Sequence, residues 1–201
     1  DHGDSAKHYQ CATHGEDFQL APEVLNDLQR NPSGANLRTY RIAVAATPSY
    51  TNSFGGTVAN GLSGVVTMIN RVSGIYEREI SVRLVVVANN DAIIYTTATP
   101  GPLPDPPNSP NSLVQTTINN AIGFANYDIG HAVGGSGGGG AITPLGNVCG
   151  TQKAQGYTAL NPPRGDIFDI DFVAHELGHQ LGGSHTWFGC GGGGQWTQTS
   201  A

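Results

Sequence analysis

Three histidines and a glutamate lie within one short stretch of the chain, "HELGHQLGGSH", which runs from His175 to His185. On a helix, residues four apart share a face, so His175 and His179 can present two imidazoles to one metal ion. On an unbroken helix His185 would lie about 9 Å further along the axis and point away. Gly182, alone or with Gly183, can take a positive φ that ends the helix and returns His185 to the same ion.

This ligand set predicts a catalytic zinc site. Three neutral nitrogens leave the fourth tetrahedral position open to water, which distinguishes a catalytic zinc site from a closed structural one. Zinc lowers the pKa of its water toward about 7 and polarises a carbonyl group. Glu176 directly follows the first ligand, so its carboxylate can take the proton of the water and pass it to a leaving amine. The stretch therefore predicts hydrolysis of peptide bonds, with His175, His179 and His185 as zinc ligands and Glu176 as general base.

Composition bounds the class of protein that carries this site. A chain of 201 residues is long enough for one sizeable core. Its net charge of -6, with 15 acidic against 9 basic residues, offers no basic face for nucleic acid or an anionic membrane. No apolar run reaches the length of about 18 residues that a membrane span needs. The chain has only two lysines and has three cysteines, which favours a secreted protein. It starts at Asp1 without a leader, which favours a mature chain.

The hydrophobic periodicity predicts the elements that position the site. Residues 1–36 form a lead-in, and residues 37–201 form the catalytic domain. The predicted elements are strands at 37–47, 80–90, 92–97 and 127–133, an edge strand at 141–149, and helices at 55–79, 112–126 and 166–183. The β-branched strand at 80–90 is expected to be covered on both faces. The glycine run at 134–140 is expected to be mobile. This order predicts an α/β (α+β) fold with a twisted, mostly parallel sheet and backing helices.

"HELGHQLGGSH" matches the metzincin pattern HExxHxxGxxH at every fixed position. The stretches "RTYRIAVAAT", "MINRVSGIYERE", "VVVANNDAIIYT", "NYDIGH" and "FDIDFVAHELGHQLGGSHT" resemble the secreted bacterial branch of the reprolysin-like (adamalysin-related) metallopeptidases. The resemblance implies a metzincin-like fold and a zinc endopeptidase with the ligands and the acid/base named above. It also implies that a protein or peptide substrate lies extended and antiparallel to an edge strand, here within Ala141–Cys149.

One feature of that family has no counterpart here. Metzincins continue past the third histidine to a turn with a methionine beneath the zinc, whereas the only methionine of this chain, Met68, lies in the helix predicted at 55–79. Met68 is expected to pack in the core. Either a C-terminal piece with the Met-turn is missing from the chain, or the floor of the pocket is built differently. We expect a missing piece, which could accompany the chain as a separate C-terminal fragment of the same protease. Two alternative functions are a zinc-containing binding module that has lost catalysis and a metallohydrolase of non-peptide amides or esters.

The three cysteines allow more than one arrangement. A bridge between Cys149 and Cys190 would close about 40 residues around the site and stabilise it by about 3 to 4 kcal/mol. In the family either cysteine could instead pair with one in the absent C-terminal part. Cys11, which lies between His8 and His14, could block the zinc as a thiolate, but an unpaired or distantly paired cysteine is the simpler interpretation.

Several other polar residues have two interpretations. His131 lies in the strand predicted at 127–133 and either lines the cleft or is a hydrogen-bonded structural histidine. Asp128 with Asp166, Asp169 and Asp171 could hold calcium, although their spacing matches no calcium loop. Capping of the last helix explains Asp166, Asp169 and Asp171 more simply.

Overall fold

A single five-stranded sheet organises the molecule, as seen in a computed structural model that describes residues 36–107 and 111–185. The strands lie in the order β2-β1-β3-β5-β4, and all neighbours are parallel except β4, which is antiparallel to β5. The strands are β1 (Arg38–Ala46), β2 (Val82–Val86), β3 (Ile129–Gly134), β4 (Gly138–Ile142) and β5 (Gly156–Leu160). The predicted α/β fold with a mostly parallel sheet is confirmed.

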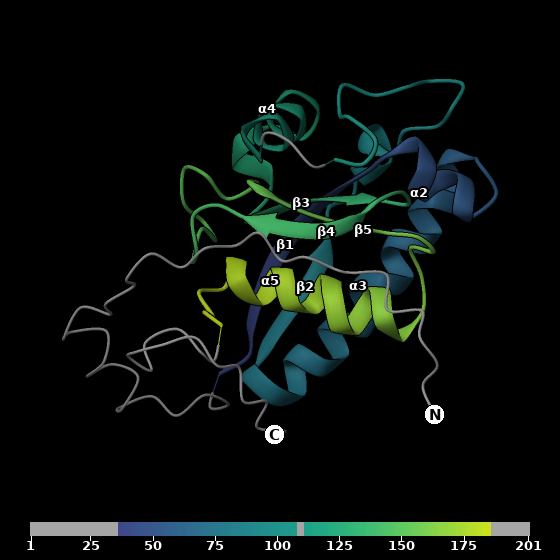
Figure 1. Ribbon diagram of the computed structural model, residues 1–201. Coiled ribbons are helices and arrows are strands. Elements are labelled where there is room, and N and C mark those ends of the chain that lie inside the picture. Colours follow the sequence, from purple (N-terminus) through teal and green to yellow (C-terminus); the bar gives the residue numbers. More distant parts are fainter. Residues whose placement is uncertain (1–35, 108–110, 186–201) are drawn as a thin grey trace, which may run out of the picture.

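Helices cover both faces of this sheet, with α3 and α5 on one side and α4 on the other (Figure 1). The α-helices are α2 (Pro48–Ser53), α3 (Val58–Ile80), α4 (Asn111–Ile122) and α5 (Ala174–Gln180). Short 3-10 turns form η1 (Asn90–Ile93) and η2 (Phe124–Asn126), and a π-helix forms η3 (Ile167–Val173). Among the helices in these ranges, none combines the length and apolar character of a transmembrane segment.

Strand β1 separates two hydrophobic cores, since its side chains alternate between the faces of the sheet. The core beneath α3 and α5 receives Ile42, Val44 and Ala46. The core beneath α4 receives Ala43 and Ala45, where the smaller side chains let that helix approach closely. Met68 of α3 lies in the first core at 2 % exposure, which confirms its predicted packing role.

Two strand predictions on the β2 side of the sheet are wrong. β2 is the outermost strand on that side and alternates buried and exposed residues, so it is not covered on both faces. Its β-branched run reflects strand propensity rather than burial. Residues 92–97 make only isolated bridges after η1. The amide of Asn90 takes the place of a strand partner there, because it accepts from the Val44 nitrogen at 2.8 Å and donates to the Val44 oxygen at 3.0 Å.

The opposite end of the sheet also differs from the sequence prediction. The glycine run does not remain a loop, because Gly138 to Gly140 begin the edge strand β4. This strand ends at Ile142, so the edge strand predicted at 141–149 is wrong in its bounds. Pro144 follows the end of the strand, where a residue without a backbone donor does not interrupt pairing. Strand β5, five residues long and buried throughout, was not predicted.

Candidate metal centre

The helix that carries the predicted ligands begins as the π-helix η3 and continues directly into α5. Asp166 and Asp169 form ion pairs with Arg71 of α3, which attach the start of this helix to the long helix below the sheet. Burial raises the pKa of Asp169, and the Arg71 charge opposes that rise. The predicted capping role is wrong: Asp166 makes no side-chain cap hydrogen bond, and Asp169 and Asp171 lie inside the helix.

The predicted break after the second histidine is confirmed. Helix α5 ends at Gln180, and Gly182 adopts a φ of 103°. The Gly182 nitrogen donates to the His179 oxygen at 3.0 Å, and the Gly183 nitrogen donates to the Gly178 oxygen at 2.9 Å. These two bonds form a Schellman motif, which requires a left-handed residue that glycine adopts without strain. A Cβ at Gly182 would meet its nearest heavy atom at 3.7 Å, so the glycine is needed for its conformation rather than for space.

Because the chain reverses at this point, the three histidines converge. Their Nε2 atoms are separated by 3.0 Å between His175 and His179, 3.1 Å between His179 and His185, and 3.2 Å between His175 and His185. An ideal tetrahedral zinc ion with bonds of about 2.0–2.1 Å holds its nitrogens about 3.3–3.4 Å apart. The three imidazole nitrogens and their spacing therefore fit a zinc ion. Within residues 36–107 and 111–185, these three histidines are the one group of His, Cys, Asp or Glu residues that could hold a metal ion.

The protonation of these imidazoles favours metal binding. The Nδ1 atom of His179 lies 2.6 Å from the Gly183 carbonyl oxygen. A carbonyl can only accept, so Nδ1 carries the proton and Nε2 presents its lone pair. Desolvation and the neighbouring His179 and His185 lower the pKa of His175 to about 4, which keeps this ring neutral at pH 7.

The predicted general base lies next to the first ligand. Glu176 belongs to α5 and is fully buried. A carboxylate removed from bulk water responds strongly to a nearby cation or proton donor, because the local dielectric constant is low. The side chain is thus placed on the element that carries the ligands and is shielded from bulk solvent.

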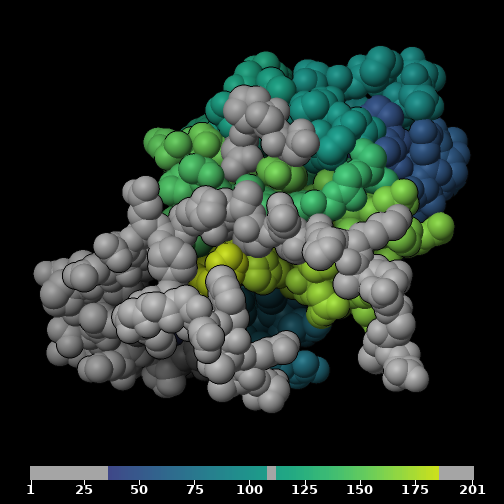
Figure 2. All heavy atoms as spheres, viewed as in Figure 1, coloured from purple at the N-terminus to yellow at the C-terminus, as the bar shows by residue number. Residues whose placement is uncertain are grey.

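A cavity of about 680 Å³ borders the three histidines. Its far wall comes from the beginning of β1 and β2 and the end of α3, with Tyr40, Tyr76 and Ile80 among the lining residues. The recess beneath α5 is visible in Figure 2. The Tyr76 hydroxyl donates to the Ala174 oxygen, one residue before His175, and so connects α3 to the ligand helix. Sequence reasoning missed this residue, whose only signal was a tyrosine on the apolar face of a helix.

The calcium and disulfide predictions receive no support. The Asp128 carboxylate lies 2.7 Å from Arg41, and Asp166 and Asp169 are paired with Arg71. Cys149 is exposed and has no disulfide in the part of the chain that the structure describes. The other two cysteines, Cys11 and Cys190, lie outside that part.

His131 does not line the cavity but is buried at 1 % exposure behind α5. Its Nδ1 lies 2.9 Å from Oε1 of Gln180, and its Nε2 lies 2.9 Å from Oγ1 of Thr158. Of its two interpretations, the hydrogen-bonded structural histidine is confirmed. The partner Gln180 was missed by sequence reasoning, because no local pattern marks this glutamine as buried.

His131 should make the stability of the fold depend on pH. Burial lowers its pKa to about 4, whereas the unfolded chain titrates near 6.5. Between pH 6.5 and pH 4 the unfolded chain binds more protons than the folded protein. The contribution of His131 to the free energy of unfolding is therefore complete above pH 6.5 and is lost as the pH falls toward 4. The loss amounts to about 3 kcal/mol. Urea unfolding of the metal-free protein measures the free energy of unfolding between pH 7 and pH 4. This free energy should decline less for His131→Gln than for the wild type. Equal declines would contradict the role of buried His131 in the pH dependence.

A comparison with protein families matches residues 36–200 of the chain to the metallopeptidase family M12B, reprolysin-like. No curated protein matches the chain. Metallopeptidases of this family use zinc, in agreement with the cluster of His175, His179 and His185. The match extends over nearly the whole chain and includes both the sheet and the ligand helix. The chain therefore belongs to the reprolysin-like metallopeptidase family M12B.

Proposed function

We propose that this protein is a secreted zinc endopeptidase that hydrolyses internal peptide bonds of proteins. The observation that carries the proposal is the convergence of three imidazole Nε2 atoms within 3.0–3.2 Å of one another on a helix that breaks at Gly182. Three neutral nitrogens leave the fourth position of a zinc ion open to a water molecule or a substrate carbonyl. A closed structural site would instead have four protein ligands.

Each residue has a defined task in this reaction. Zinc, when bound, supplies a Lewis acid that activates water and polarises the scissile carbonyl. Glu176 accepts the proton of the attacking water and delivers it to the amine that leaves. The Nδ1–H of His179 donates to the Gly183 carbonyl oxygen, which holds the ring in the orientation that directs Nε2 toward the other two imidazoles and would let it bind zinc. Fixed ligands of this kind need no rearrangement during the reaction, which lowers the barrier.

The substrate is proposed to bind as an additional strand beside β4. β4 is the outermost strand of the described sheet on that side, and α5 packs against both β4 and β5. Main-chain hydrogen bonds to an edge strand would hold an extended peptide above the ligand helix without selecting its side chains. Gly138 to Gly140 add no side chains of their own to this edge. We therefore propose Gly138–Ile142 as the binding edge, which lies partly outside the segment Ala141–Cys149 expected from the sequence.

The composition supports an extracellular site of action. The chain has only two lysines and 29 glycines, and its charge is -6. Such a surface interacts weakly with nucleic acid and anionic lipid, which leaves soluble or extracellular proteins as substrates.

Metal analysis combined with two substrate assays tests the proposal. We expect about one zinc per chain, cleavage of casein that stops when a chelator removes the metal and returns with added zinc, and new internal termini in the products. Hydrolysis of small esters without cleavage of casein would favour the metallohydrolase, and zinc binding without any turnover would favour a binding module. An intact mass of the active sample shows whether a second polypeptide from the same protease accompanies the chain.

A further inference from the structure

A buried amide connects the ligand helix to the sheet. Gln180 directly follows the ligand His179 and has no exposed surface. Its Nε2 lies 3.0 Å from the Gly130 oxygen, 3.1 Å from Oδ1 of Asn147 and 3.3 Å from the Lys153 oxygen. All three are acceptors, so the orientation of the amide is determined: Nε2 faces them and Oε1 faces the other way.

On that other side Oε1 lies 2.9 Å from Nδ1 of His131. Since Oε1 can only accept, the proton of the neutral imidazole lies on Nδ1. The Nε2 atom of His131 then accepts a hydrogen bond from the Thr158 hydroxyl at 2.9 Å. The resulting chain runs from β5 through β3 to α5, and each member has its donor and acceptor roles determined by the next.

The sheet makes room for this pair of side chains at Gly156. A Cβ there would lie 3.0 Å from Oε1 of Gln180 and 3.0 Å from Nδ1 of His131, and 2.4 Å from Cδ1 of Ile142. Contacts of this length are tighter than nearly all real Cβ contacts. A larger residue at Gly156 would require Ile142 to move and the hydrogen-bonded pair to shift by a few tenths of an ångström. The glycine at the first position of β5 therefore leaves space for the pair.

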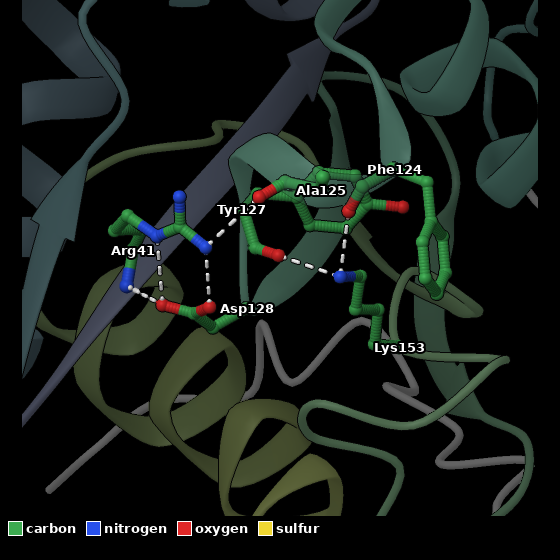
Figure 3. Close-up of polar contacts among 6 residues, drawn as sticks. All are labelled: Arg41, Phe124, Ala125, Tyr127, Asp128 and Lys153. Atoms are coloured by element: carbon green, nitrogen blue, oxygen red, sulfur yellow. Dashed lines mark hydrogen bonds and ion pairs between the residues drawn. The ribbon is translucent and has the colours of Figure 1, made fainter.

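The acceptors of Gln180 are themselves held in place. The Lys153 ammonium donates to the Phe124 and Tyr127 oxygens, each at 2.7 Å, and lies 3.9 Å and 4.5 Å from the centres of their rings. Figure 3 shows this ammonium between the two carbonyl groups, beside the ion pair of Arg41 and Asp128. The loop between β4 and β5, which contains Lys153, is thus attached to the segment that precedes β3.

The same loop contacts the ligand residue directly. The Gly146 nitrogen donates to the His179 oxygen at 3.0 Å, and the next residue, Asn147, is the acceptor for Gln180. His179 lies in the last turn of α5, so contacts made by that turn bear on where this ligand stands. Displacing a ligand by a fraction of an ångström is enough to weaken a metal site.

We propose that Gln180 and His131 are positioning residues of the metal site, which set the place of His179 relative to the sheet. Any effect on catalysis rests on the proposed function, but the first effect that we expect from losing these residues is weaker zinc binding. Partners that lie behind the metal ligands commonly change affinity or activity by about 10- to 100-fold when they are removed. Neither residue touches the metal or the substrate; they act through the helix.

The test replaces Gln180 with methionine, which keeps the length of the side chain and removes the amide. For the full chain we expect the zinc dissociation constant, measured by competition with a chromogenic chelator, to rise about tenfold or more. The visible spectrum of the Co²⁺-substituted protein should also change, because it reports the geometry of the three imidazole ligands. With zinc at saturation, kcat should fall more than KM rises.

Asn90→Leu is the matched control, because it removes another fully buried amide that bonds β1 rather than α5. It should lower the melting temperature by a similar amount and leave zinc affinity and the Co²⁺ spectrum unchanged. Thr158→Val, an isosteric change that keeps the fold, should weaken zinc binding by about threefold through His131.

The outcomes separate this inference from the proposed function. If Gln180→Met and Thr158→Val bind zinc as tightly as the wild type with the same Co²⁺ spectrum, the positioning role is wrong. A similar loss of affinity in Asn90→Leu would also overturn it, since general destabilisation would then be the cause. A wild-type protein that binds zinc with the expected dependence on Gln180 but cleaves no protein would overturn the proposed function alone.

Discussion

Replacing Glu176 with glutamine is expected to lower kcat/KM for casein by about 10³-fold while zinc remains bound, because general base catalysis contributes about 10²- to 10⁴-fold. The amide has nearly the same size as the carboxylate but cannot accept the proton of the attacking water. Glu176 is fully buried on the ligand helix, so no bulk buffer base can easily take its place. The measurement is steady-state kinetics on fluorescently labelled casein together with zinc content by elemental analysis.

Glu79→Gln is the control for that experiment. It makes the same chemical change and the same change of charge on the exposed side of α3, where Glu79 pairs with Arg78 at 2.6 Å. An exposed pair of this kind contributes little, so activity and zinc content should stay at the wild-type values. If Glu176→Gln keeps more than about a tenth of the wild-type rate, Glu176 is not the general base, since a base contributes about 10²-fold or more.

The metal cluster could be predicted from the sequence because every determinant of it is local. Helical periodicity places His175 and His179 on one face, and a left-handed glycine ends the helix before His185. All the residues that bring the three imidazoles together therefore lie within eleven consecutive positions, and the Nε2 separations agree with this prediction. Strands β1 and β3 and the long helix α3 were predictable for the same reason, since the pattern of each lies within one continuous stretch of sequence.

What the sequence could not show depends on contacts between distant segments. Gln180 meets acceptors 27 to 50 residues away, and no local pattern distinguishes it from a surface glutamine. Asp169 was taken for a cap, but it lies opposite Arg71, 98 residues earlier. The glycines of β4 carry almost no strand propensity, and they form a strand because β5 lies beside them. In each case tertiary contacts override the local preference.

Replacing His179 with alanine should abolish tight zinc binding. The Nε2 atom of His179 lies 3.0 Å and 3.1 Å from those of His175 and His185, and the residue is 4 % exposed. Removing partners behind the ligands costs about 10- to 100-fold in affinity, so the loss of a ligand should exceed 100-fold. Two imidazoles do not complete a catalytic zinc site, and peptidase activity should fall to background at micromolar zinc.

Ser184→Ala provides the matched control for this loss. Ser184 is an exposed residue in the short segment between His179 and His185, and it lines the cavity. The change leaves the Schellman motif and all three imidazoles in place, so zinc affinity should remain within about twofold of the wild type, as is usual for a surface substitution. Isothermal titration of both metal-free variants with zinc gives the comparison. Stoichiometric, tight binding by His179→Ala would mean that the metal is held elsewhere, and the convergence of the three rings would then have another cause.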